Sequence, residues 1–505
     1  FFFFDLGVVD VSLIPRYGQL FSHTAGDLTP VIGSGLGGSA YSSRPSNSNL
    51  IQLSTSSIGS IGIGGSWSFF NPKQNQTISV SLGHDTWTHN YKYSNYLGER
   101  LKRIGAQGSR SEFSVLSRSI NPESKIWSSQ SVYGVNMNRG LPEPSTAAYR
   151  EGANQTDSRV QLNNSIGYSK RNYSLETRQS VFYSNQSYTN AISDVLDTNY
   201  SNGSSLELIN IWKWGKFSLA NQSQVQYFGI SGQNKPDTGI TSISNLTSLK
   251  HHISKTQYIS IYNKSSYQDL INGVGGSSPG IQFFSECKNR ELDIHLKRIF
   301  RLPTMNDLFW SPGGNPNLIP ESGWDLKASF SLQNKHNIFK FEAFAGRLNN
   351  GIIWRPNGLF WQPINEFLIT RYGINSSWQV IWPSQFVQFE IQALQSQNAD
   401  NLPIPYSTPF RLRMIYSKQI QFGKLGFMGL YQIGVPTLWT TNRSTDLPNC
   451  SNLSLFYENK IFEFKNKSSI EIQFRLENLL NQQIVFQRNY PMPGRHINLS
   501  FQINL

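Results

Sequence analysis

Two short motifs in the chain have the spacing of catalytic or cofactor-binding loops. Residues 33–38 read G-S-G-L-G-G and match the G-x-G-x-x-G pattern of dinucleotide sites. Serine, arginine and proline follow where a helix should begin, and no acidic residue stands between Asp27 and Asp85 to bind a ribose. Residues 276–280 match the nucleophile elbow G-x-S-x-G, but Pro279 blocks the helix that must follow the serine. Neither motif predicts an active site, so we do not expect an enzyme and assign no catalytic residue.

The histidines do not form a metal-ligating pattern. His84 and His89 are five positions apart, and an odd interval places them on opposite faces of a strand. Adding Asp85 does not bring these side chains together as metal ligands. His251 and His252 are adjacent, so they too point to opposite faces of a strand. We therefore expect no metal site and no cofactor.

The composition excludes several classes of protein. The 505 residues include 44 Lys and Arg against 31 Asp and Glu, a net charge of +13, but the basic residues are scattered and do not indicate nucleic-acid binding. Only 15% of residues are charged, and 13% are aromatic. No apolar run is long enough for a membrane-spanning helix, because even 1–9 is interrupted by Asp5. The chain opens without Met or a leader pattern, and we expect it to be incomplete at its N-terminus.

Alternation of apolar and polar residues is the dominant pattern. It is clearest over the last nine residues, which match the length of a transmembrane strand. The apolar residues there are Ile497, Leu499, Phe501, Ile503 and Leu505. Similar alternation occurs at 470–476, 78–82 and 339–343. Taken alone, each segment is equally typical of a strand in a soluble β-sandwich that has one face exposed to water.

The connections favour a membrane barrel over a sandwich. Short polar turns are predicted at 71–76, 121–125, 170–172, 214–216, 250–254, 287–290, 334–337, 383–385, 423–424 and 463–467. Successive turns are separated by roughly 35 to 50 residues, enough for two membrane-length strands and a loop. Ten such turns, with a further strand at each end of the series, predict an all-β, transmembrane antiparallel barrel of about 22 strands.

Long loops are predicted at the other end of this barrel. They cover 303–321, 346–372, 396–409, 432–452 and 478–494. Cys287 then lies in a short turn and Cys450 in a long loop, too far apart for a disulfide. We expect both cysteines to be free.

Motifs in the second half of the chain resemble a known family. The segments are F-R-L-P-T at 300–304, N-D-L-F at 306–309, G-N-P-N-L-I-P-E at 314–321, E-N-L-L-N at 477–481 and Y-P-M-P-G-R at 490–495. Together they resemble TonB-dependent outer-membrane receptors, and the last is similar to the form in Bacteroidetes receptors. The resemblance spans about 300–505.

The start of the chain resembles the end of the plug domain of these receptors. The segment 12–15 reads S-L-I-P, and a Gly-rich turn follows with Gly33, Gly35, Gly37 and Gly38. Glycines suit a backbone that turns tightly inside a barrel. The resemblance implies two domains: the C-terminal part of a plug at 1–49 and a transmembrane barrel at 50–505.

The resemblance also implies a mechanism. Outer loops and plug capture a scarce solute, and a TonB complex in the periplasm releases it by pulling on the plug, provided that a full plug exists. The order of motifs and the compact loops look most like receptors for cobalamin or iron chelates. The location implied is the outer membrane of a Gram-negative bacterium, in contact with its lipid.

Six residues in the predicted outer loops are candidates for solute capture, because aromatic and cationic side chains bind amphipathic ligands well. They are Trp310, Trp354, Arg355, Trp361, Tyr372 and Trp439. An alternative for each is a place in the aromatic girdle at the membrane interface. Phe501 and Leu505 are expected to act in barrel closure and insertion.

Two other functions stay open at this point. A barrel without a working plug could be a scaffold or passive pore in a larger outer-membrane complex, with an outer-membrane lipoprotein as one possible partner. A soluble, aromatic-rich glycan-binding β protein is the third, and it would purify without detergent.

Overall fold

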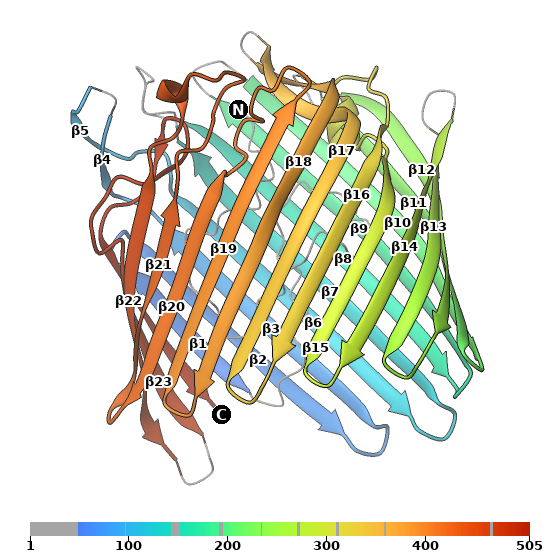
Figure 1. The fold of residues 1–505 in the computed structure, drawn as a ribbon. Coiled ribbons are helices and arrows are strands. Elements are labelled where there is room, and N and C mark those ends of the chain that lie inside the picture. The colour runs from blue at the N-terminus through green and yellow to red at the C-terminus, as the bar shows by residue number, and fades with distance from the viewer. Residues whose placement is uncertain are drawn as a thin grey trace.

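The computed structural model describes residues 49–95, 97–142, 152–190, 195–233, 235–269, 273–309, 313–357, 360–464 and 468–505. In these ranges 22 strands form one antiparallel sheet (Figure 1). The strands are β1 (Leu50–Ser56), β2 (Ser60–Asn71), β3 (Gln76–Trp87), β6 (Gly108–Asn121), β7 (Ile126–Leu141), β8 (Ala153–Ser169), β9 (Tyr173–Asn190), β10 (Val195–Trp214), β11 (Phe217–Gly232), β12 (Lys235–His252), β13 (Gln257–Gln268), β14 (Val274–Cys287), β15 (Arg290–Arg301), β16 (Glu321–Gln333), β17 (Asn337–Asn357), β18 (Phe360–Trp382), β19 (Gln385–Asn398), β20 (Phe410–Ile420), β21 (Gly423–Gln432), β22 (Cys450–Glu463), β23 (Ser469–Glu477) and β26 (His496–Asn504).

The loops contain the remaining elements. These are the short strands β4 (Lys92–Ser94), β5 (Arg100–Lys102), β24 (Val485–Gln487) and β25 (Tyr490–Pro491), the helix α1 (Met305–Phe309) and the 3-10 helix η1 (Arg443–Thr445). Within the described ranges, no helix is long and apolar enough to cross a membrane.

The sheet closes on itself through its first and last strands. Each of β1 and β26 pairs with the other and with one further strand, so neither is an edge. Leu53 of β1 lies opposite Phe501 of β26, and Phe501 lies opposite Ile472 of β23. The predicted 22-stranded antiparallel barrel is therefore confirmed, and the sandwich alternative is excluded for the described part of the chain.

Alternation along each strand separates an apolar outside from a polar inside. In β9, Val181 and Tyr183 are 53% and 54% exposed on the outer face, whereas Arg178 points inward and binds Glu207 of β10. Some inner carboxylates are strongly buried, with Asp157 1% and Glu207 5% exposed. A closed barrel of this pattern satisfies its backbone hydrogen bonds between strands and presents aliphatic side chains to lipid.

The connections divide the barrel into two ends. Ten short connections lie at the lower end in Figure 1, and each falls at or within a few residues of a predicted turn. The turn between β10 and β11 has Gly215 at φ 55°, and the turn between β14 and β15 has Lys288 at φ 55°, the left-handed backbone that tight hairpins require. We call this the short-turn end and the opposite one the loop end.

One predicted loop is wrong. The segment 346–372 was expected to be a long loop, but β17 continues to Asn357 and β18 begins at Phe360. The pairing skips Asn350 and Phe367, since Asn349 faces Leu368 and Gly351 faces Glu366. The register is the same on both sides of this pair, Asn350 has a left-handed φ of 54°, and the hairpin continues past it. The predicted loops 303–321, 396–409, 432–452 and 478–494 do lie between strands.

Two aromatic bands mark the outer surface. At the short-turn end, Trp214 stacks on Phe217 with ring centroids 6.4 Å apart, and Trp378 on Phe389 at 6.1 Å. Nearer the loop end, Tyr183 stacks on Tyr200 at 6.4 Å. Such bands lie at the two membrane interfaces of outer-membrane barrels. The segment between them is therefore the part that meets hydrocarbon.

Cys287 and Cys450 are both free, as predicted. The first described strand begins at Leu50. Almost all of the predicted plug segment, 1–49, lies outside the described residues, so the division into plug and barrel remains a prediction.

Candidate functional site

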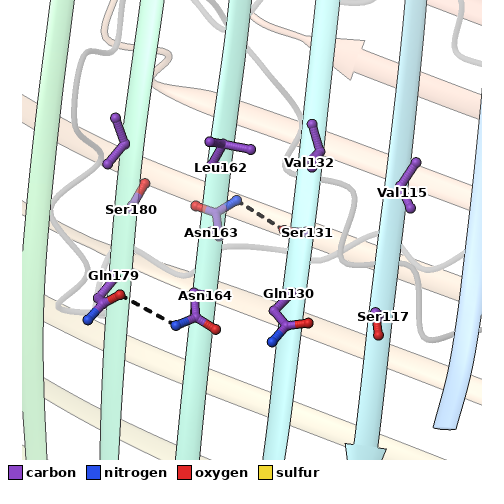
Figure 2. Close-up of a pocket in the computed structure, with 11 residues that line it drawn as sticks. Val115, Ser117, Gln130, Ser131, Val132, Leu162, Asn163, Asn164, Gln179 and Ser180 are labelled. Atoms are coloured by element: carbon purple, nitrogen blue, oxygen red, sulfur yellow. Dashed lines mark hydrogen bonds between the residues drawn. The ribbon is translucent and has the colours of Figure 1, made fainter.

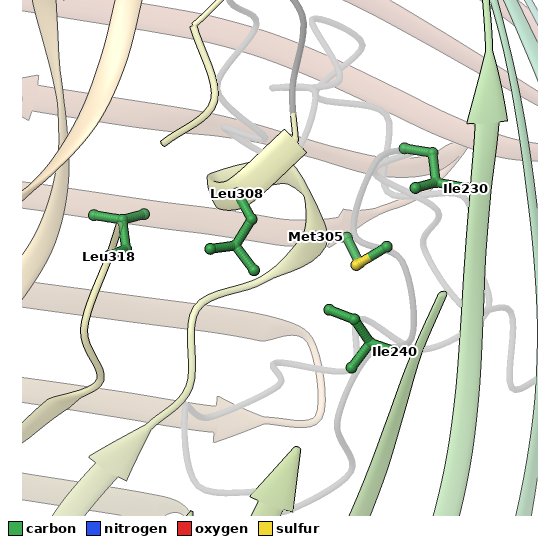
Figure 3. Packing of buried hydrophobic residues seen from close by; sticks show 5 residues of the cluster. All are labelled: Ile230, Ile240, Met305, Leu308 and Leu318. Carbon is green, nitrogen blue, oxygen red and sulfur yellow. The ribbon is translucent and has the colours of Figure 1, made fainter. Parts of the chain in front are cut away.

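The loop between β15 and β16 folds into the barrel mouth instead of extending from it. Met305 and Leu308 of α1, with Leu318, pack against Ile230 of β11 and Ile240 of β12 (Figure 3). Leu308 is 1% exposed, and burying one leucine side chain contributes about 1.5 to 3 kcal/mol. The loop therefore joins β15 and β16 to strands on another part of the wall.

A local sequence signal starts this loop helix. The backbone N–H and the hydroxyl of Thr304 donate to Oδ2 of Asp307 at 2.9 and 2.8 Å, and the Asp307 N–H donates to the Thr304 hydroxyl at 3.2 Å. This reciprocal capping box is what T-x-x-D predicts at a helix start. It holds the Asp307 carboxylate in one position.

Asp307 is the centre of a polar cluster. Its Oδ1 accepts a hydrogen bond from Nε1 of Trp354 on β17 at 3.1 Å, and its Oδ2 lies 3.7 Å from a guanidinium nitrogen of Arg301. Arg301 also forms an ion pair with Glu321, which accepts from the backbone N–H of Ile352. Asp307 and Glu321 are each 6% exposed, so both charges are compensated inside the mouth.

The same loop is tied to the extended β17–β18 hairpin by amide side chains. Asn365 accepts from the N–H of Ile319 at 3.0 Å and donates to the carbonyls of Ile319 and Asn350 at 2.9 and 2.8 Å. Asn315 donates to the Pro363 carbonyl at 3.0 Å. Loop and hairpin therefore form one unit.

A second group on this hairpin combines a cation with an aromatic ring. The Arg355 guanidinium forms an ion pair with Glu366 and lies 4.0 Å from the ring centroid of Trp439, in the loop between β21 and β22. Glu366 also accepts from Nδ2 of Asn398 at 3.3 Å. Among the described residues, Nε of Arg355 has no hydrogen-bond partner. A planar cation over an indole is an arrangement that can bind an anionic, partly aromatic ligand.

Two other loops are joined elsewhere on the loop end. Gln483 exchanges two hydrogen bonds with the backbone of Ser94, at 3.1 and 2.8 Å. The hydroxyl of Tyr91 donates to the Pro491 carbonyl at 3.0 Å, and the Arg103 guanidinium lies 5.9 Å from the Tyr490 ring centroid. These contacts fasten the loop after β3 to the loop after β23, beside the seam where the barrel closes.

The structure brings three of the six predicted capture residues close to one another. Trp354 and Arg355 are neighbours on β17, and Trp439 lies against Arg355. Trp361 is in β18, where its backbone pairs with Pro356. Trp310 lies outside the described residues.

Tyr372 is placed apart from that group. It lies within β18, is 49% exposed, and shares the outer face with Ile374 and Trp378. The predicted plug glycines Gly33, Gly35, Gly37 and Gly38 all lie outside the described residues. Phe501 is 36% exposed on β26, and the N–H of Leu505 donates to the Asn49 carbonyl at 2.8 Å, next to the closing seam.

Sequence reasoning did not select the charged residues that organise the mouth. Arg301, Asp307 and Glu321 all stand in the motifs that carried the family resemblance, yet none was named as a site residue. The T-x-x-D spacing was a usable signal for Asp307. No local signal shows that Glu366 and Trp439, more than 70 positions apart, meet at Arg355.

The fold is similar to those of several solved transport proteins. The copper transporter OprC matches with a TM-score of 0.75 and 10% identity over 91% of this chain and 80% of that one. The siderophore receptor PirA from Acinetobacter baumannii matches at 0.74 and 9%, with the same coverage. The FrpB iron transporter from Neisseria meningitidis (F5-1 variant) matches at 0.76 and 8% over 91% of this chain and 82% of that one.

No protein-family model matches the chain, and no curated protein matches it. At 8–10% identity the structural matches establish the fold. The apolar exterior between two aromatic bands agrees with the predicted location in the outer membrane of a Gram-negative bacterium. The chain thus has the 22-stranded barrel fold of TonB-dependent outer-membrane receptors.

Proposed function

We propose that this protein is an outer-membrane transporter that binds a scarce solute at its loop end and imports it. The solute is an iron chelate or cobalamin, and import is driven through a plug by the periplasmic TonB complex. The observation that carries the proposal is the barrel itself, which has the fold of transporters for copper, siderophores and iron.

The loop-end geometry supports solute capture. The loop between β15 and β16 packs inside the mouth, and Arg355 on β17 lies against Trp439 of the loop between β21 and β22. Sites on strands are held more precisely than sites on free loops, which reduces the entropy lost on binding. An anionic iron chelate with aromatic groups would match a guanidinium beside an indole.

The test is binding of a panel of radiolabelled ferric siderophores and a corrinoid to the purified, detergent-solubilised chain. One member should bind, and Arg355→Ala and Trp439→Ala should each weaken that binding by about tenfold, because each removes a strong contact. Trp378→Ala is the matched control, since this tryptophan lies on the outer face near the short-turn end, and it should leave binding unchanged.

Absence of binding across the panel would overturn the proposal. If the solute binds but its uptake into cells continues after the proton gradient is collapsed, the capture part of the proposal stands and TonB-driven import is excluded. That second result would favour the passive pore or scaffold in a larger complex, with a lipoprotein or other outer-membrane partner.

A further inference from the structure

Two arginines stand on the outer face of the barrel, one on either side of an exposed tryptophan. Arg298 of β15 pairs with Trp324 of β16, and Trp324 pairs on its other side with Arg347 of β17. Paired residues of a sheet point to the same face, and Trp324 is 52% exposed on the face that meets lipid. Neighbouring strands lie about 4.8 Å apart, so the Cα atoms of the two arginines are roughly 10 Å from each other. We call Arg298 and Arg347 the arginine pair.

The arginine pair lies at the level of the aromatic band nearer the loop end. Arg347 and the outward Tyr183 each stand ten residues beyond the first residue of a strand that starts at the short-turn end, and Arg298 stands eight beyond. Tyr183 belongs to that band, which marks a membrane interface. Because long loops of such barrels face outward and arginine side chains extend toward head groups, both guanidinium groups reach the head groups of the outer leaflet.

The strand pairing beside Arg298 agrees with this level. β14 starts at Val274 and β15 continues to Arg301, but their pairing with each other extends only to Gly280 and Lys297, just before Arg298. Backbone groups that leave a sheet need other polar partners, which hydrocarbon cannot supply. The wall beside Arg298 is therefore at the polar boundary of the membrane.

The arginine pair has no opposite charge close to it. Neither guanidinium forms a hydrogen bond or an ion pair with another residue that the structure describes, whereas the inward Arg301 binds Glu321. The described carboxylates of β15, β16 and β17 all occupy the alternate, inward positions. Two uncompensated cations side by side favour an anionic ligand from outside the chain.

The wall formed by β6–β9 shows how other polar groups of the barrel surface are accommodated. A hollow of about 310 Å³ there is lined by aliphatic residues, hydroxyls and amides, and none of its lining side chains is charged (Figure 2). Nδ2 of Asn164 donates to Oε1 of Gln179 at 3.4 Å within it. Neutral groups of this kind find partners in one another, which two guanidinium groups cannot do.

We propose that the arginine pair and Trp324 bind the phosphate-bearing head group of a lipid in the outer leaflet. Guanidinium groups form paired hydrogen bonds with phosphate oxygens, and basic sites at membrane surfaces recognise anionic lipid head groups. Two positions closer to the short-turn end, Leu296 and Leu326 are 40% and 47% exposed and face acyl chains. The matching ligand is therefore anionic at one end and apolar at the other, which describes a lipid and not a soluble anion.

The test measures lipid binding to the full chain. The chain is stripped of lipid in a neutral detergent and titrated with a bisphosphorylated diglucosamine lipid, and native mass spectrometry counts the molecules retained. One lipid should stay bound. The double variant Arg298→Gln with Arg347→Gln should weaken its binding by about twentyfold, because each arginine beside an anionic lipid contributes about fivefold.

Arg290→Gln is the matched control for this variant. Arg290 is exposed on the same strand and, by alternation, on the same face as Arg298, but it stands at the short-turn end. Its replacement should change binding by less than about twofold. Equal binding by the double variant and by Arg290→Gln would overturn the proposal.

Replacement of both arginines by lysine separates charge from geometry. Arg298→Lys with Arg347→Lys keeps both charges but loses the paired donors, so binding should fall by about threefold, less than in the glutamine variant. Folding of every variant is checked by heat-dependent migration on a denaturing gel. If the glutamine variant does not fold, the lysine variant takes its place, and unchanged binding in it would overturn the proposal.

Two further ligands distinguish a lipid from a free anion. The dephosphorylated form of the same lipid should bind about tenfold more weakly, and inorganic phosphate should not displace the intact lipid. Equal binding of the dephosphorylated lipid would overturn the proposal, because acyl chains alone would then explain the contact. Complete displacement by inorganic phosphate would also overturn it. No transported solute is used, so failure here and failure of the transport proposal are distinguishable.

Discussion

At one depth in the membrane, the outer face of β11–β13 presents Asn221, Asn245 and Asn263, whereas the outer face of β16–β18 presents Leu326, Ala343 and Ile374. Asn245 and Leu326 are closely matched, since each stands seven residues before the end of its strand, at His252 and Gln333. Both sides have the same backbone, the same alternation and the same pairing geometry. They differ only in the side chains at the outward positions, which are amides on one side and aliphatic on the other.

The difference shows that alternation decides which way a side chain points and not whether its surroundings are suitable for it. Aliphatic residues on β16–β18 are stable in lipid alone. The amides on β11–β13 need hydrogen-bond partners, which Asn221 and Asn245 find in one another and in neighbouring hydroxyls. The loop between β15 and β16 connects the two sides at the mouth by packing on Ile230 and Ile240.

The largest effect is expected from a charge placed on the apolar side. Leu326→Arg should lower the free energy of unfolding by about 2 to 4 kcal/mol, because a guanidinium near the middle of the bilayer loses its hydration. Asn245→Arg, at the matched depth, should cost clearly less, since Ser223 and Thr247 remain as hydrogen-bonding neighbours. Urea unfolding in lipid vesicles measures both, and equal costs would contradict the distinction between the two sides.

A smaller effect is expected where the loop joins the two sides. Leu308→Ala should lower the free energy of loop opening by about 2 kcal/mol, since it removes the most buried contact of α1 with β11 and β12. Hydrogen exchange of the Leu308 and Asn315 amides, which donate to Thr304 and Asp307, reports this opening.

Ile319→Ala is the control for this loop, because Ile319 lies in the same segment but is 50% exposed. It should leave exchange at those amides nearly unchanged. Unchanged exchange in Leu308→Ala would show that the cluster does not hold the loop.

The smallest effects are expected from neutral exchanges in the monomer. Asn245→Leu loses hydrogen bonds worth about 0.6 kcal/mol each in a membrane but adds apolar surface facing lipid, so the monomer should change by about 1 kcal/mol or less. Ser376→Leu should be neutral or slightly stabilising. Unfolding measured at high lipid-to-protein ratio tests this, and a large loss in Asn245→Leu would mean that its hydrogen bonds contribute more to barrel stability than this estimate.

Much of the barrel could be predicted from local sequence. The spacing of Gly, Asn, Pro and Lys at the short turns gave the number of hairpins, because a tight turn needs particular backbone conformations that few residues adopt, as at Gly215. The strand length and the outward face followed from alternation. The hairpin between β17 and β18 did not, since Asn350 has a left-handed φ of 54° and only the pairing with the neighbouring strand keeps the chain extended on both sides of it.

The candidate site was predictable only in part. Trp354, Arg355 and Trp439 were selected by residue type and expected position, but their meeting depends on a contact between a hairpin and a loop far apart in the chain. The role of Asp307 as a centre for Trp354 and Arg301 depends equally on the inward fold of its loop. Neither follows from the spacing of residues in one segment.

The sequence by itself determined that this chain forms antiparallel strands with one apolar face, because period-two alternation and turn residues act within a few positions of one another. Tertiary structure decided which side chains share the mouth and which share the outer surface. Strand pairing brings Asn221 next to Asn245, and loop packing brings Asp307 next to Trp354, through contacts between residues distant in sequence. Closure of the sheet fixes those neighbours, and closure is a property of all 22 strands together.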